Sequence, residues 1–120
     1  MKSWDFIGLR FALDGLGILL RQRNFRVELV FAFLALGLGF YLDIDGQEWL
    51  WISLAITLVL VAEAINTAIE LTLDRVGTEF HTSTKQAKDI AAGAVVLCCL
   101  HAIVIGSVII GPKLWTLLFA

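Results

Sequence analysis

Proline, cysteine and charge are all scarce in this chain of 120 residues. The single proline, Pro112, leaves no proline-rich linker that would divide the chain, so we expect one domain over residues 1–120. The two cysteines, Cys98 and Cys99, are adjacent in an apolar run, where they cannot form an ordinary disulfide and are interpreted as small packing residues. A net charge of −2 without any block of like charges gives no sign of a nucleic-acid partner.

Hydrophobic residues, by contrast, make up 59% of the chain, and the mean hydropathy is +0.88. A soluble domain of 13.2 kDa could not bury so much apolar surface, because small folds have a high ratio of surface to volume. About 20 helical residues cross the roughly 30 Å of hydrocarbon in a bilayer. Three segments approach this length, at about 25–42, 49–73 and 90–110. They lack an alternation of period two, so we expect helices and not barrel strands, with Pro112 closing the third span.

Residues 1–22 differ from the three spans because polar residues recur at helical spacing. One narrow stripe of a helix would carry Ser3, Arg10, Asp14, Gly17 and Arg21. We expect an amphipathic helix on the membrane surface, and no cleaved signal peptide, because charges interrupt the segment. The predicted fold class is therefore an all-α membrane protein with three transmembrane helices plus an N-terminal amphipathic surface helix.

The distribution of charge predicts how the protein is oriented, because cytoplasmic flanks collect Lys and Arg. Basic residues lie before the first span or between the second and third, at Lys2, Arg10, Arg21, Arg23, Arg26, Arg75, Lys85 and Lys88. The connection 43–48 holds only acids, and Lys113 is a single exception near the end of the chain. We therefore expect a cytoplasmic N-terminus and a cytoplasmic loop over residues 74–89.

A polar stripe stands out at the inner end of the second span: Glu63, Asn66, Thr67, Glu70 and Asp74. At about 100° per residue these positions fall at relative angles of about 0°, −60°, 40°, −20° and 20°, so all five share one face. An ionisable group inside a span costs on the order of 2.5 to 3.5 kcal/mol. Asn66 and Thr67 alone could equally serve to hold helices together, but two carboxylates add repulsion and little adhesion. The whole stripe is thus interpreted as a functional site.

Further charged residues follow at the predicted inner mouth of the bundle: Asp74, Arg75, Glu79, His81, Lys85, Lys88 and Asp89. Carboxylate oxygens suit Mg²⁺, and Lys neutralises phosphate charge, so this mixture is a plausible place for a metal-bound phosphate. Taken by itself, His81 is more often a loop histidine than a ligand. Asp89 is expected at the start of the third helix, followed by small residues that let a ligand or helix come close.

Three segments at these residues resemble the signature of the bacterial diacylglycerol kinase family of small membrane lipid kinases, which includes undecaprenol kinases. They are EAINTAIE from Glu63 to Glu70, DRVGTEFH from Asp74 to His81, and AKDIAAGAV from Ala87 to Val95. A looser resemblance extends upstream through Phe11, Gly15 and the segment 23–25, so about four-fifths of the chain is covered.

This resemblance implies a homotrimer of three-span subunits in the bacterial inner membrane, with active sites shared between neighbouring subunits. Glu63 would be the general base and, with Asn66, would bind the lipid. Glu70 would bind the metal, and Glu70 and Asp74 would contact ATP. The remaining ATP-binding residues would be Glu79, His81, Lys88 and Asp89. Because the chain has no GxxxxGK[ST] motif, ATP would bind in a way unrelated to P-loop proteins.

One position departs from the family pattern. The family commonly has a glutamate just before the Arg-Asn-Phe motif, where it serves as a second metal ligand, and here that position is Gln22. An amide oxygen can coordinate Mg²⁺ but contributes no charge, so Gln22 is a doubtful ligand. Glu28 is a poor replacement, because six residues rotate about 240° around a helix and rise about 9 Å. We therefore hypothesise weaker or single-metal binding.

The resemblance leaves the lipid open. Residues 74–79 resemble the diacylglycerol kinase branch, whereas residues 88–95 look more like undecaprenol kinases. We expect ATP- and Mg²⁺-dependent phosphorylation of diacylglycerol to phosphatidic acid, with undecaprenol as the alternative substrate. From other classes, a small proton-coupled transporter would have four spans and an acid in the first, and a non-catalytic subunit or holin would not need Glu63.

Overall fold

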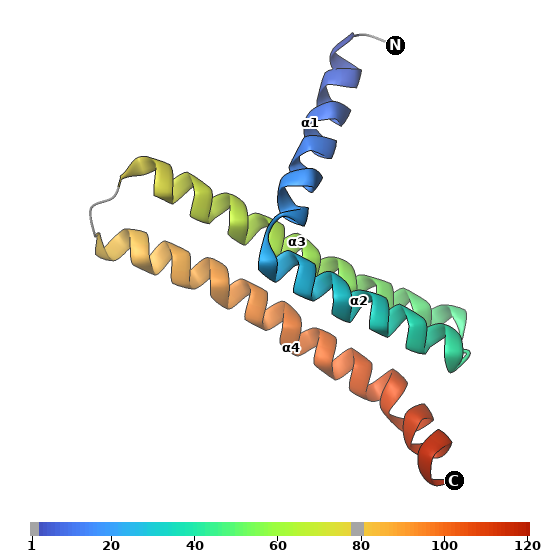
Figure 1. Cartoon of the computed structure of the whole chain (residues 1–120). Coiled ribbons are helices and arrows are strands. Elements are labelled where there is room, and N and C mark those ends of the chain that lie inside the picture. Colours follow the sequence, from blue (N-terminus) through green and yellow to red (C-terminus); the bar gives the residue numbers. More distant parts are fainter. Residues whose placement is uncertain (1–2, 78–80) are drawn as a thin grey trace.

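The computed structural model describes residues 3–77 and 81–120, with side chains described from residue 8 onward. The described residues form helices and no strand, which confirms the all-α prediction. The helices are α1 (Ser3–Leu20), α2 (Arg23–Tyr41), α3 (Gly46–Val76) and α4 (Thr82–Phe119). In Figure 1, α3 and α4 run side by side over much of their length, and α2 lies along the half of α3 nearest the α2–α3 turn.

Three of these helices, α2, α3 and α4, are long and apolar enough to cross a membrane, as predicted. With 31 and 38 residues, α3 and α4 are about 47 Å and 57 Å long at 1.5 Å per residue. Both lengths exceed the roughly 30 Å of hydrocarbon. Each of these two helices therefore has more than two turns that lie outside the hydrocarbon or are tilted within it.

The limits of α4 correct two predictions. The helix begins at Thr82, so Asp89 lies inside it and not at its start. Residues 82–88 are polar but include the good helix formers Lys, Gln and Ala, and an apolar pattern marks only where a helix meets lipid. Pro112 also lies inside the helix, which continues to Phe119. A proline lacks the N–H that would bond to the carbonyl four residues earlier, here that of Val108, and membrane helices tolerate such a loss. One turn later, Thr116 Oγ1 donates to the Pro112 carbonyl at 3.0 Å.

The turn between α2 and α3 is fixed by acidic residues. Asp43 adopts a positive φ of 52°, a left-handed conformation that Asp tolerates better than most residues. Asp45 caps α3: its Oδ1 accepts from the Glu48 backbone N–H at 2.8 Å, while Glu48 Oε1 accepts from the Asp45 N–H at 3.1 Å. This reciprocal capping box satisfies two backbone donors that a helix start leaves free. Glu48 also pairs with Lys113 of α4 at 3.6 Å, which ties α4 to the turn.

Of the two glycines near the end of α2, Gly37 and Gly39, only Gly39 closely approaches another helix. A Cβ placed on Gly39 would lie 2.6 Å from a ring atom of Trp49 and 3.1 Å from Ile44. The Trp49 ring is itself held against Phe40, with ring centroids 4.7 Å apart. A Cβ on Gly37 would meet nothing within 4 Å.

Little of the described surface is buried. A small cluster of Ile44, Ile52 and Ile109 forms the core near the α2–α3 turn. Elsewhere large apolar side chains face outward, such as Phe31 and Leu97, which are 67% and 69% exposed. So continuous an apolar exterior needs lipid or another protein surface to cover it.

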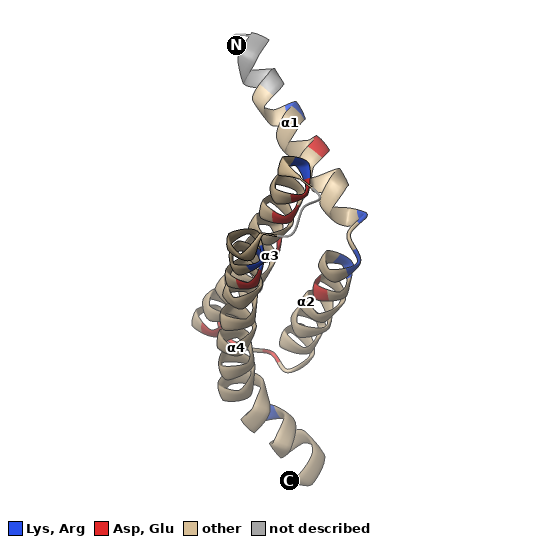
Figure 2. Cartoon of the chain, turned by 90° about the vertical axis from the view of Figure 1, so that its left-hand side faces the viewer, with Lys and Arg blue, Asp and Glu red and all other residues tan. Residues whose placement is uncertain are grey.

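The N-terminal helix α1 is confirmed as a helix, and it leaves the bundle at an angle, with contacts to α2 (Figure 1). Lys and Arg gather around the junction of α1 and α2, as Figure 2 shows. The exposed side chains of α1 include Leu9, Phe11, Leu13 and Leu16. These apolar residues agree with the prediction of a helix at a membrane surface, which stays a prediction.

The two glycines of α2 provide a matched test of the α2–α3 contact. We expect Gly39→Ala to lower the free energy of unfolding by about 1 to 3 kcal/mol, because the added methyl group overlaps the Trp49 ring. Gly37→Ala should be neutral or stabilising by up to about 1 kcal/mol, because alanine favours the helix and meets open space. Reversible unfolding in mixed detergent micelles measures both. Equal effects of the two substitutions would contradict the packing described.

Candidate functional site

The polar stripe of α3 changes from buried to exposed along its length. Glu63, Asn66 and Thr67 are only 5–6% exposed, and they are the buried polar side chains among the residues that the structure describes. Glu70 and Asp74, further along the helix, are exposed. In a bundle that buries so little, the burial of these three residues shows that the first part of the stripe faces the other helices.

Hydrogen bonds within α3 hold the stripe in order. Asn66 Nδ2 donates to Glu70 Oε1 at 3.1 Å, which positions the Glu70 carboxylate over the preceding turn. Thr67 Oγ1 donates to the backbone carbonyl of Glu63 at 2.9 Å. The Asn66 Oδ1 atom is buried and has no partner within the described chain. A buried polar atom left without a partner is costly, so this oxygen is available to a donor from outside the chain.

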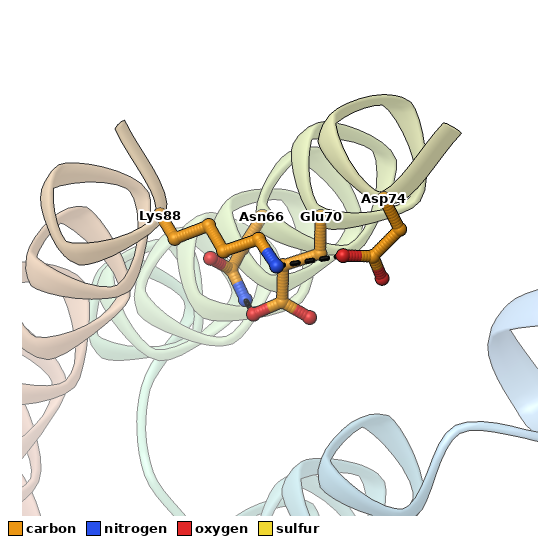
Figure 3. Close-up of polar contacts among 4 residues, drawn as sticks. All are labelled: Asn66, Glu70, Asp74 and Lys88. Carbon is orange, nitrogen blue, oxygen red and sulfur yellow. Dashed lines mark hydrogen bonds and ion pairs between the residues drawn. The ribbon is translucent and has the colours of Figure 1, made fainter. Parts of the chain in front are cut away.

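One ion pair links α3 to α4 at this end of the bundle. Lys88 Nζ donates to Asp74 Oδ1 at 2.6 Å across the two helices. Figure 3 shows Lys88 reaching from α4 toward the row of Asn66, Glu70 and Asp74. Lys88 also interacts electrostatically with Glu70, and Glu70 with Glu63. The arrangement thus places one cation beside two exposed carboxylates, with a third carboxylate buried behind them.

Three other residues are predicted to bind ATP: Asp89, His81 and Glu79. Asp89 accepts from Lys85 Nζ at 2.5 Å, one turn away on α4. His81 precedes α4 as its N-cap residue. Glu79 lies outside the described residues. Their roles toward ATP therefore stay predictions.

The predicted metal ligands are Glu70 and Gln22. Gln22 is the N-cap residue of α2, and no hydrogen bond joins its side chain to Glu70. Within the part of the chain that the structure describes, no three His, Cys, Asp or Glu side chains cluster as a metal site. Mg²⁺ commonly uses only one or two protein carboxylates together with phosphate oxygens. The exposed carboxylate of Glu70 is a hard oxygen donor of the kind this ion prefers, so it fits a phosphate-bound Mg²⁺.

Glu28 of α2 is a further carboxylate near the stripe, which the sequence did not link to it. Along a single helix, Glu28 is too far from position 22 to replace a metal ligand there. In the structure, Glu28 Oε2 is buried without a hydrogen-bond partner in the described chain, and its carboxylate interacts electrostatically with Glu63. The partly buried thiol of Cys99 on α4 lies near both carboxylates. One indication of this position is visible in the sequence: Glu28 is an acidic residue inside a predicted span.

The amino-acid sequence is similar to those of known proteins. A family model described as prokaryotic diacylglycerol kinase matches residues 10–110. The chain belongs to the prokaryotic diacylglycerol kinase family. Relatives include a diacylglycerol kinase of Escherichia coli (strain K12), 32% identical over 71% of this chain and 70% of the relative. An undecaprenol kinase of Bacillus subtilis (strain 168) is 39% identical over 78% of this chain and 76% of the relative. A diacylglycerol kinase of Helicobacter pylori (strain ATCC 700392 / 26695) is 37% identical over 74% of this chain and 70% of the relative.

Membership of this family confirms the resemblance seen in the sequence. The protein is a lipid kinase of a bacterial membrane, and ATP is the co-substrate that a kinase of this family implies. The transporter interpretation required four spans, whereas the described residues form three helices of sufficient length. The kinase interpretation therefore replaces it.

The Lys88–Asp74 pair is expected to contribute little to stability. Both side chains are substantially exposed, at 38% and 63%, and exposed ion pairs are typically worth less than about 1 kcal/mol. Lys88→Met should therefore lower the free energy of unfolding by no more than about 1 kcal/mol. The ion pair between Lys113 and Glu48, near the α2–α3 turn, supplies the control. Lys113→Met should lower the free energy of unfolding by a similarly small amount. A loss above about 2 kcal/mol for Lys88→Met alone would mean that the pair is structural, and not free to exchange Asp74 for phosphate.

Proposed function

We propose that the protein transfers the γ-phosphoryl group of ATP to the hydroxyl of diacylglycerol, giving phosphatidic acid and ADP. The observation that carries the proposal is the gradient along α3, from buried Glu63 to exposed Glu70 and Asp74. Seven residues separate Glu63 from Glu70, a rise of about 10 Å along the helix. A lipid hydroxyl can approach the buried end of such a face while a water-soluble nucleotide approaches its exposed end.

In this proposal Glu63 is the general base. Its carboxylate takes the proton of the lipid hydroxyl as that oxygen bonds to the γ-phosphorus. The bond from the γ-phosphorus to the bridging oxygen breaks, and ADP leaves. Phosphoryl transfer requires mainly that the groups be held in line and that charge be neutralised, so one base and a few charged residues suffice. Asn66 lies nearly one turn from Glu63 on the same buried face, where it would contact the lipid beside the base.

ATP would be bound by Glu70 together with five further residues: Asp74, Glu79, His81, Lys88 and Asp89. Lys88 already stands between Asp74 and Glu70, where it could neutralise phosphate oxygens. Glu70 would hold Mg²⁺, with Gln22 as a doubtful second ligand. When bound, Mg²⁺ would neutralise negative charge on the β- and γ-phosphates. Asn66 supports this division, because its hydrogen bond holds one Glu70 oxygen and leaves the other to bind.

Undecaprenol remains the second candidate substrate. The observation in its favour is the similarity to the undecaprenol kinase of Bacillus subtilis, which covers slightly more of this chain than the similarity to the Escherichia coli diacylglycerol kinase. Both lipids present one hydroxyl on an apolar body, so the same base and phosphate site serve either. Diacylglycerol is preferred because the segment 74–79 resembles that branch.

The assembly proposed with this function is a homotrimer in the inner membrane, with the N-terminus in the cytoplasm and residues 1–120 as one domain. Basic residues around the α1–α2 junction support that orientation (Figure 2). Two features support shared sites: the bundle buries few side chains of its own, and Asn66 Oδ1 finds no donor within the described chain. A neighbouring subunit would cover the exposed apolar side chains and would supply hydrogen-bond donors.

Replacing the proposed base tests the function directly. Glu63→Gln should lower the kcat of lipid phosphorylation at least about a hundredfold, because general-base catalysis contributes that much or more. The control Asp43→Asn makes the same acid-to-amide change at an exposed turn, where Asn tolerates the positive φ, and should keep full activity. Rates are measured on reconstituted protein with saturating ATP and diacylglycerol. A Glu63→Gln variant that remains folded and fully active would refute the role of Glu63.

The absence of a carboxylate at position 22 predicts weak metal binding. Gln22→Glu should lower the Mg²⁺ concentration that gives half-maximal activity, by about threefold or more, because a charged oxygen replaces a neutral one. Gln47→Glu makes the same change at the exposed start of α3 and should have no effect. Activity is measured across a magnesium titration at fixed ATP. An unchanged magnesium dependence in Gln22→Glu would rule out a metal role for this position.

A further inference from the structure

The length of α4 carries its last turns beyond the hydrocarbon. Ion pairs join α3 and α4 at both ends of their contact, Lys88 with Asp74 and Lys113 with Glu48. Along either helix these ends are about seven turns, or about 38 Å, apart. That distance exceeds the roughly 30 Å of hydrocarbon and approaches the 40 to 45 Å, roughly, of a whole bilayer. The two ion pairs therefore mark opposite faces of the membrane, and residues 114–120 follow after α4 has crossed it.

The residues that follow this crossing are mostly apolar. Four large apolar side chains of the segment are between 51% and 67% exposed: Trp115, Leu117, Leu118 and Phe119. Figures 1 and 2 both show this end of α4 extending beyond the α2–α3 turn. If the segment continued straight into water, these side chains would be hydrated, which is unfavourable. The described chain leaves them uncovered, so they need an apolar environment from outside it.

The apolar residues of the segment share one side of the helix. At about 100° per residue they cover an arc of about 200°. They are Leu114, Trp115, Leu117, Leu118 and Phe119. The rings of Trp115 and Phe119 contact each other one turn apart, with centroids 4.4 Å apart. Lys113 and Thr116 lie on the opposite side. An apolar side with Trp, Phe and Leu and a polar side with Lys are typical of a helix that lies along a membrane surface.

Other aromatic residues gather at the same end of the bundle. Phe40 and Tyr41 are exposed at the end of α2, and Trp51 is exposed near the start of α3. Tyrosine and tryptophan are enriched where the hydrocarbon meets the lipid headgroups. Trp115 lies close to this level, because the neighbouring Lys113 pairs with Glu48 of α3. The aromatic residues thus place the start of the segment in the headgroup region.

Pro112 stands where the helix would have to change direction. It directly precedes Lys113, at the level where α4 reaches the membrane face. Sharp bends in helices are commonly found at proline, because its ring removes a backbone hydrogen bond. The amphipathic segment therefore begins at a position where α4 can turn into the plane of the membrane.

We infer that residues 113–120 form an interfacial helix that binds the headgroup region of the leaflet farthest from the polar stripe. Trp115 and Phe119 would face the acyl chains, while Lys113 and Thr116 would face water and the lipid phosphates. The pair of Lys113 with Glu48 would hold the start of the segment against α3. The inference depends neither on the proposed catalytic function nor on which membrane face is cytoplasmic.

The depth of Trp115 in the bilayer tests this inference. Changing the other three tryptophans, Trp4, Trp49 and Trp51, to phenylalanine leaves Trp115 as the only one. The full chain is reconstituted in dioleoylphosphatidylcholine vesicles that contain phosphatidylcholine brominated either close to the headgroup or close to the chain end. Bromine close to the headgroup should quench the emission about twofold more strongly or better, because interfacial helices lie only about 5 to 10 Å into the boundary.

Three other outcomes would each overturn the inference. Stronger quenching by bromine at the chain end would mean that the segment crosses the hydrocarbon. Weak quenching with red-shifted emission would place Trp115 in water, and weak quenching with blue-shifted emission would mean that protein covers it. If the variant with three substitutions does not fold, the difference in emission between the unsubstituted protein and Trp115→Phe supplies the same measurement.

Two exposed positions of the segment provide a matched test of its orientation. Thr116→Lys adds a charge on the polar side and should leave the quenching of Trp115 unchanged. Leu118→Lys adds the same charge on the apolar side. It should reduce quenching by headgroup-proximal bromine about twofold or more, because a charge disfavours the acyl region and draws the segment toward water. Equal effects of the two substitutions would contradict the proposed orientation. If Leu118→Lys does not fold, the depth of Trp115 decides the question alone.

Discussion

Hydrocarbon offers no hydrogen-bond partners, and this single constraint governs where polar groups lie in the protein. Helices satisfy the backbone internally, so the spans can be built from almost any apolar residues. Side chains are restricted more severely, because each buried polar atom needs a partner from the bundle or from a ligand. Glu63, Asn66 and Thr67 share one inward face of α3. Buried atoms of Glu28, Asn66 and His101 have no hydrogen-bond partner among the described residues, so at these points the chain alone does not meet the requirement.

Because α3 and α4 are longer than the hydrocarbon is thick, the polar stripe of α3 can extend from the membrane into water. The stripe continues from buried Glu63 to exposed Asp74. The polar first turns of α4 bring Lys88 to the same level, where it bridges to Asp74. A lipid kinase must bring together a hydroxyl dissolved in the membrane and a triphosphate dissolved in water. A single helical face that crosses from one environment to the other meets this need without a soluble nucleotide-binding domain.

Much of this arrangement can be predicted from the sequence, because it depends on periodicity along single helices. Hydropathy located the three spans, and the 100° spacing placed the stripe on one face. Hydropathy did not locate the start of α4, because it records contact with lipid and is silent on polar turns such as residues 82–88. The helix also continues past Pro112, because membrane helices tolerate the loss of a single backbone hydrogen bond. Gly37 and Gly39 look alike in the sequence, and only the position of the Trp49 ring distinguishes them. Glu28 could not be linked to Glu63, since that proximity depends on how two helices pack.

The most direct test of the account is whether the purified, unsubstituted protein moves phosphate from water into the membrane phase. ATP labelled at the γ-phosphate is supplied to reconstituted vesicles that contain diacylglycerol and undecaprenol in equal amounts, and the lipid extract is separated. The account predicts that label appears in a lipid phosphomonoester, chiefly phosphatidic acid, and that it does so only when both ATP and a lipid alcohol are present. Label that stays in ATP, or that is released only as inorganic phosphate, would contradict it.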